Sequence, residues 1–206
     1  MSPRQLRYLA LGDSYTIGEG VAEHERWPVQ LATRLRTQDI PLANPEIIAM
    51  TGWTTDELAV GIDKAHLLGP YDFVSLLIGV NNQYRGRSLD EYRQQFRGLL
   101  QRAIAFGAGD ASRVLVVSIP DWSVTPFANR RDCAAIAAEI DMFNAANREE
   151  TERTSAGYLD ITPLSSAQGK MVVKDGIHPN GKAYAAWAEL ALPIAHAMLR
   201  STGGSS

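Results

Sequence analysis

Ser14 lies on a turn opened by Gly12, directly after a short apolar run at residues 7–11. A serine at the end of a parallel strand can project its hydroxyl into the crevice where open α/β sheets bind ligands. A helix beginning there would direct its backbone N–H groups at the same point. The same position is also typical of a helix cap formed by Asp13 or Ser14. Taken alone, this segment supports a nucleophile or a cap.

Asp175 and His178 lie three residues apart near the other end of the chain, separated by the turn-permitting Gly176. A turn of this length can fold the carboxylate onto the Nδ1–H group of the histidine. That contact fixes the tautomer and leaves Nε2 free as a base, which a serine hydroxyl needs in order to become a good nucleophile. The alternative is a surface turn before a helix capped by Asn180, which gives no reason for the histidine.

Two further segments follow apolar runs and could stabilise a developing oxyanion. Gly52 can bring its backbone N–H close to a ligand because it has no Cβ, although it could also be the turn before a helix capped by Thr54 or Thr55. Asn81 follows the next run and can offer a side-chain N–H to an oxyanion. Asparagine is also a common turn residue, so this position alone proves little.

Five short apolar runs must position these side chains. Most are continuous rather than alternating, which suits strands buried on both faces of a parallel sheet. The predicted strands are Arg7–Leu11, Glu46–Met50, Phe73–Ile78, Arg113–Ile119 and Tyr158–Ile161.

Helical periodicity separates several of these runs. Apolar residues recur every three or four positions from Tyr92 to Ile104, an alanine-rich helix is expected over about 132–153, and another begins near Asn180. Pro193 should kink or split the last helix. Repeated strand–helix alternation predicts one three-layer α/β/α sandwich over residues 1–200, followed by a flexible tail at 201–206.

The composition is that of an ordinary soluble globular protein. A formal charge of −3 without a clustered basic stripe argues against nucleic acid or an anionic membrane as partner. No run is long enough to span a membrane or to form a signal-peptide core. The single cysteine, Cys133, excludes an internal disulfide, is expected to be buried, and favours a cytoplasmic location. No spacing of His, Cys, Asp and Glu resembles a metal site.

The ordered set of segments resembles the SGNH/GDSL hydrolase family. That family's pattern is a Gly-Asp-Ser block, a glycine, a Gly-x-Asn block and an Asp-x-x-His block. All four occur here in order and extend from Leu11 to Asn180. The resemblance implies a flavodoxin-like sandwich with a five-stranded parallel sheet, and chemistry without metal or organic cofactor.

The resemblance also implies roles for individual residues. Ser14 matches the nucleophile, His178 the general base and Asp175 the residue that orients it. The expected oxyanion donors are the backbone N–H groups of Ser14 and Gly52 and the side-chain amide of Asn81.

Two positions depart from the family pattern. Tyr15 stands where the family name has leucine, which changes little. Asn82 stands where the family usually has an aspartate after its Gly-x-Asn block. Asn82 keeps hydrogen-bonding capacity but lacks the charge, which leaves its role as a loop anchor open.

The expected activity is hydrolysis of small carboxylic esters, with acetylated sugars and lysophospholipids as further candidates. Four aromatic residues in the strand-end loops are the candidate lining of the substrate pocket, although each could simply pack its loop: Trp53, Tyr84, Trp122 and Phe127. Arg85 and Arg87 could meet an anionic group or be solvated.

The alternatives to an esterase are an acyltransferase that uses the same residues, or a non-catalytic flavodoxin-like ligand-binding module. The oligomeric state is left open.

Overall fold

The computed structural model describes residues 4–202 and contains a five-stranded parallel sheet in the order β2-β1-β3-β4-β5. This is the flavodoxin-like strand order, so the predicted fold class is confirmed, and each of the five predicted strands is present within a few residues. The strands are β1 (Tyr8–Gly12), β2 (Glu46–Ala49), β3 (Phe73–Leu77), β4 (Val114–Val117) and β5 (Gly157–Leu159).

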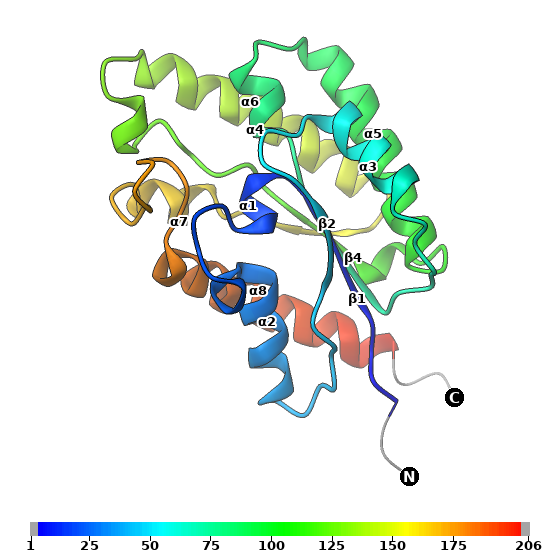
Figure 1. The fold of residues 1–206 in the computed structure, drawn as a ribbon. Coiled ribbons are helices and arrows are strands. Elements are labelled where there is room, and N and C mark those ends of the chain that lie inside the picture. Colours follow the sequence, from blue (N-terminus) through cyan, green and yellow to red (C-terminus); the bar gives the residue numbers. More distant parts are fainter. Residues whose placement is uncertain (1–3, 203–206) are drawn as a thin grey trace.

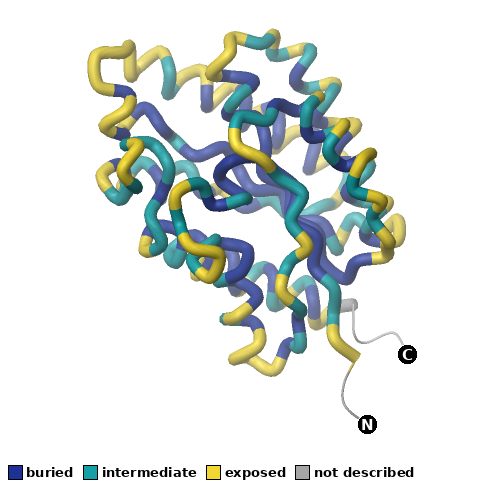
Figure 2. The backbone as a smooth tube through the Cα atoms, viewed as in Figure 1, coloured by how far each residue is buried: buried dark blue, intermediate teal, exposed yellow. Residues whose placement is uncertain are grey.

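Burial divides the sheet into a central part and two edges. Every residue of β1, β3 and β4 is buried, whereas β2 and β5 are partly exposed. Figure 2 shows the dark, buried centre surrounded by tubes that are exposed on their outer sides. The parallel register pairs Tyr8 with Phe73 and Gly12 with Leu77, so β1 and β3 end together.

Helices cover both faces of the sheet (Figure 1). α2 and α8 pack against each other in one layer, while α5 contacts α3 and α6 in the other. The helices are α1 (Ser14–Ile17), α2 (Trp27–Arg36), α3 (Thr55–Lys64), α4 (Val80–Tyr84), α5 (Leu89–Phe106), α6 (Cys133–Glu152), α7 (Thr162–Ala167) and α8 (Gly181–Thr202), with short 3-10 turns η1 (Glu23–Glu25), η2 (Ala111–Arg113) and η3 (Pro126–Ala128).

Helix α8 corrects two expectations. Of the kink or split expected at Pro193, the split does not occur, because Leu192 and Ala195 are both buried in the core and packing holds the chain helical on either side of the proline. The helix also continues through Thr202, so residues 201 and 202 of the expected tail belong to the helix. The rest of that tail, 203–206, lies outside the described residues.

The expectation that Cys133 is buried is wrong. Cys133 is the first residue of α6 and is exposed. The residues of α6 become buried only from Ile140 onward, and in the first two turns Ile136 packs against the core while only partly buried. Across residues 4–202, no helix combines the length and apolar character needed to cross a bilayer.

Asp13 is a fully buried carboxyl between β1 and α1. Its Oδ1 accepts a hydrogen bond from the Tyr15 N–H at 3.0 Å and so caps α1. Burial raises the pKa of Asp13 from 3.8 to about 7, although the hydrogen bond from Tyr15 acts in the opposite direction. Between these two pH values the folded protein holds a proton that the unfolded chain releases.

Asp13 should therefore make the protein less stable as pH rises. The contribution of protonated Asp13 to the free energy of unfolding is complete below about pH 4. It is lost as pH rises towards 7, the pKa of this group in the folded protein. Asp13→Asn keeps the cap but cannot titrate. As pH rises over this range, its free energy of unfolding should therefore increase relative to that of the wild type by on the order of a few kcal/mol. Denaturant unfolding at a series of pH values measures this, with Asp39→Asn at an exposed turn as control. Parallel stability curves for wild type and Asp13→Asn would contradict the raised pKa.

Candidate active site

The carboxyl ends of β1, β2 and β3 open into a cavity of about 290 Å³. Open parallel sheets bind ligands at this edge, beside the point where the strand order reverses between β1 and β3. The cavity brings together most of the residues selected from the sequence, and its lining includes Ser14, Gly52, Asn81, Tyr84, Trp122, Phe127, Asp175 and His178.

Ser14 is the first residue of α1 and comes two residues after the end of β1. Its side chain is nearly buried, at 3% relative exposure, but still lines the cavity. The cap of α1 is supplied by Asp13 rather than by Ser14, so the serine hydroxyl is not used as a cap. Within the described residues, the backbone N–H of Ser14 donates to no other residue and is free to bind a ligand atom.

Asp175 and His178 form the pair expected from their spacing. His178 Nδ1 lies 2.6 Å from Asp175 Oδ2, and Asp175 Oδ1 accepts the backbone N–H groups of Ile177 and His178 at 2.9 and 3.0 Å. Gly176 has a φ of 77°, which closes this turn in the left-handed region. Partial burial raises the pKa of Asp175, but the bonds from His178 and the two N–H groups outweigh it and hold this pKa below 3.8. The carboxylate is therefore charged at neutral pH.

Contacts from three directions fix the loop that carries His178. The His178 carbonyl accepts the Val173 N–H at 2.8 Å, next to an antiparallel bridge between Val172 and Pro179. The Gly176 carbonyl accepts the Phe127 N–H at 3.0 Å. The ring of Tyr15 lies 5.3 Å from the imidazole, centroid to centroid. Tyr15, which follows the serine, thus supports the histidine, a role that the sequence alone did not indicate.

Ser14 and His178 are far apart in the sequence but line the same cavity. In the described part of the chain, no hydrogen bond joins Ser14 Oγ to the imidazole. Such contacts are often open before substrate binds and tighten in the complex.

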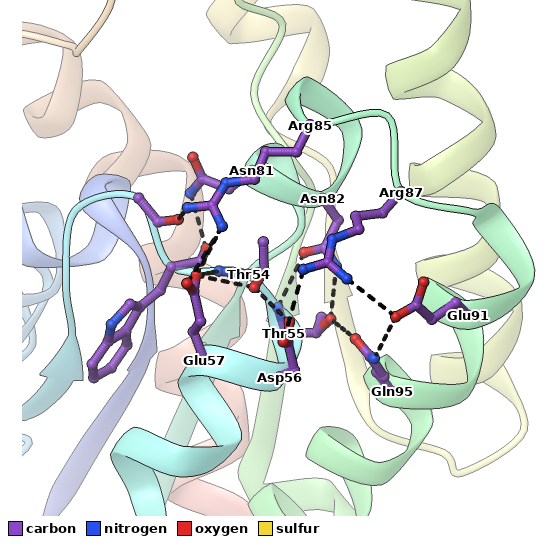
Figure 3. Close-up of polar contacts among 12 residues, drawn as sticks. Thr54, Thr55, Asp56, Glu57, Asn81, Asn82, Arg85, Arg87, Glu91 and Gln95 are labelled. Carbon is purple, nitrogen blue, oxygen red and sulfur yellow. Dashed lines mark hydrogen bonds and ion pairs between the residues drawn. The ribbon is translucent and has the colours of Figure 1, made fainter.

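Gly52 takes a conformation that suits a backbone donor. Its φ is +86°, and its N–H donates to no other described residue. Its carbonyl accepts a 2.6 Å hydrogen bond from the Arg85 guanidinium, which also pairs with Glu57 at 3.3 Å (Figure 3). Arg85 therefore fastens the Gly52 peptide from outside the cavity.

Asn81 is the second residue of α4 and lines the cavity from the end of β3. Its Nδ2 donates to the Trp53 carbonyl at 2.9 Å. An amide nitrogen carries two N–H groups, so this bond orients the side chain and leaves the second N–H unused.

Asn82 points away from the cavity and anchors α3. It is 1% exposed; its Oδ1 accepts the Thr55 N–H at 3.1 Å and its Nδ2 donates to Thr55 Oγ1 at 2.8 Å. The Thr55 hydroxyl in turn donates to Gln95 Oε1 (Figure 3). Asparagine here joins the start of α3 to α4 and α5 as a neutral residue. This answers the question left open by the absence of the usual aspartate.

Three of the four aromatic residues proposed for the pocket meet there. Tyr84, Trp122 and Phe127 line the cavity and contact one another with ring centroids 5.6 to 6.2 Å apart. Trp122 Nε1 donates to Gln83 Oε1 at 2.9 Å, which fixes the indole. We call these three residues the aromatic wall.

The fourth, Trp53, does not line this cavity. Its indole lies against Gly61 of α3, where a Cβ would overlap the ring. Because Gly61 has no side chain, the Trp53 ring can pack directly against α3. The expectation that Trp53 lines the substrate pocket is therefore corrected. No three His, Cys, Asp or Glu side chains within residues 4–202 come together as a metal site requires.

A protein family and several solved structures are similar to this chain. Residues 10–186 match the GDSL-like lipase/acylhydrolase family. No curated protein matches the chain.

Several solved structures share the fold. TesA aligns with a TM-score of 0.74 at 20% identity, over 93% of this chain and 99% of its own. The acetyl xylan esterase AlAXEase aligns with a TM-score of 0.72 at 16% identity, over 91% and 98% of the two chains. A variant of Axe2, an acetyl-xylooligosaccharide esterase from Geobacillus stearothermophilus, aligns with a TM-score of 0.70 at 18% identity, over 92% and 94%.

The family match covers most of the chain and contains the serine, the glycine and the asparagine at the strand ends as well as the Asp-x-x-His turn. The chain belongs to the GDSL-like lipase/acylhydrolase family and is a serine hydrolase that acts on esters.

Proposed function

We propose that Ser14, His178 and Asp175 form the catalytic triad of an esterase for small carboxylic esters. The observation that carries the proposal is the 2.6 Å contact between His178 Nδ1 and Asp175, beside a cavity that also contains Ser14. Such a carboxylate holds the imidazole in the tautomer that leaves Nε2 free to take a proton. The other two members of the site, Gly52 and Asn81, line the same cavity.

The reaction follows from these positions. Ser14 Oγ attacks the ester carbonyl carbon while His178 Nε2 accepts the hydroxyl proton, and Asp175 stabilises the imidazolium that forms. The tetrahedral oxyanion accepts hydrogen bonds from the free N–H groups of Ser14 and Gly52 and from the second N–H of Asn81. As the intermediate collapses, the alcohol leaves with the proton from His178. Water repeats these steps on the acyl-enzyme, and the acid is released.

The size of the cavity favours a short acyl group. At about 290 Å³ it is at the lower end of ligand pockets. Two solved structures with this fold are named as acetyl xylan or acetyl-xylooligosaccharide esterases. Short-chain and acetyl esters, including those of sugars, are therefore our first substrate candidates, with lysophospholipids after them. Cytoplasmic location stays a prediction from the sequence.

Hydrolysis of p-nitrophenyl esters of increasing acyl length tests the proposal. We expect the wild type to hydrolyse the short esters fastest and Ser14→Ala to lose this activity while keeping its circular dichroism spectrum and melting temperature. Ser112 lies in η2 just before β4, and so at the amino end of the strand, away from the carboxyl ends that form the cavity. Ser112→Ala serves as the matched control and should remain active. Activity that survives in a folded Ser14→Ala protein would remove Ser14 from the mechanism.

Asn81→Ala should lower kcat by about 10²–10³-fold with a much smaller change in KM, because an oxyanion donor acts mainly in the transition state. Steady-state kinetics on the best ester measures both constants. Asn129→Ala, an exposed asparagine in the neighbouring loop, should leave kcat unchanged. A near-normal kcat in Asn81→Ala would exclude this side chain as a donor.

An acyltransferase would use the same residues with an alcohol in place of water. Product analysis with an added acceptor alcohol separates the two outcomes. We expect free acid as the main product, whereas transfer to the acceptor as the dominant product would favour the transferase.

A further inference from the structure

Arg131 lies against all three rings of the aromatic wall. Its Cζ is 4.9 Å from the ring centroid of Phe127, 5.4 Å from that of Tyr84 and 5.7 Å from that of Trp122. Each distance is within the range at which a guanidinium is attracted to a ring face. One of its nitrogens also lies 3.4 Å from the Tyr84 hydroxyl. The rings thus hold a positive charge beside the cavity that contains Ser14.

This charge has no acidic partner. Throughout residues 4–202, Arg131 forms no ion pair, and the neighbouring Asp132 carboxylate instead caps α6 by accepting the Ala135 N–H. The arginines first considered for binding an anion differ in this respect. Arg85 pairs with Glu57, and Arg87 lies near both Asp56 and Glu91 (Figure 3). They are neutralised within the fold, whereas Arg131 is not.

The chemistry of arginine indicates what such a group can bind. The guanidinium is always charged and can stack on aromatic faces. A guanidinium presents five N–H donors in its own plane, which match the paired oxygens of a carboxylate or phosphate. Arg131 is exposed and is not among the residues that line the cavity. An anion bound to it would therefore lie at the rim of the cavity, on a substituent that extends from the ester.

We propose that Arg131, held on the aromatic wall, selects esters that carry an anionic oxygen group, a carboxylate or a phosphate, beyond the scissile bond. The inference rests on the proposed esterase function and deepens it. Arg131 would bind the substrate and take no part in proton transfer. Its effect should therefore fall on KM, and only for charged esters.

Matched pairs of esters test this directly. In the acyl arm, p-nitrophenyl monoesters of succinate, glutarate and adipate are compared with neutral p-nitrophenyl esters of the same chain length. In the alcohol arm, 4-acetoxybenzoate is compared with its neutral methyl ester. The two arms show on which side of the scissile bond the anion lies. The proteins are the wild type, Arg131→Gln, Arg131→Lys and the control Arg130→Gln, which removes one charge from the adjacent exposed residue.

In at least one arm, Arg131→Gln should lower kcat/KM for the charged ester by about tenfold or more, mainly through KM. The neutral partner should change by less than about twofold. Arg130→Gln should behave as the wild type, and Arg131→Lys should retain part of the preference because it keeps the charge without the planar donors. Equal effects of Arg131→Gln on charged and neutral esters in both arms, or an equal loss of preference in Arg130→Gln, would overturn the inference.

The outcomes also separate this inference from the function on which it rests. If the neutral esters are hydrolysed in a Ser14-dependent way but hydrolysis of the charged esters does not depend on Arg131, only the proposed role of Arg131 is wrong. If the folded wild type hydrolyses none of the esters in either arm, the proposed esterase function falls together with the substrate class.

Discussion

Burial of β1 and β3 on both faces is the constraint on which the site depends. All residues of both strands are buried, and the register places Gly12 opposite Leu77, so the two strands must end at one level. The chain after β1 then places Ser14 beside the segment after β3, which carries Asn81. Gly79 makes that turn possible, since its φ is +130° and a Cβ would overlap the Tyr92 hydroxyl and the Ile119 side chain.

Hydrogen bonds between neighbouring segments fix the site residues that the strands bring together. Arg85 fastens the Gly52 carbonyl, the Trp53 carbonyl orients Asn81, and Asn82 ties α3 to α4. In the loop that carries His178, the Phe127 N–H donates to the Gly176 carbonyl. The candidate catalytic groups therefore come from turns and from the first residues of the short helices α1 and α4. The segments that carry Gly52, Asn81 and His178 are each bonded to a neighbour. This is how a rigid arrangement can be built from loops, as preorganised catalysis requires.

Sequence patterns could predict the strands and the main site residues because each has a local signal. The apolar runs reveal the strands, and the three-residue spacing of Asp175 and His178 defines a turn that their side chains can close. The short helices α1, α4 and α7 have four to six residues, too few for a helical period to show. The position of Trp53 depends on a glycine eight residues later that has no side chain. The surroundings of Arg131 depend on three rings from two separate segments of the chain, one at the end of α4 and one between β4 and α6.

The central claim is that Ser14 is the nucleophile, and covalent labelling tests it most directly. The wild type is treated with a fluorophosphonate, and the modified peptide is located by mass spectrometry, with and without excess short-chain ester. We predict a single adduct on Ser14 that the ester suppresses and that does not form in His178→Ala, where the base is missing. An adduct on another residue, or no adduct on a folded protein that hydrolyses esters, would contradict the account.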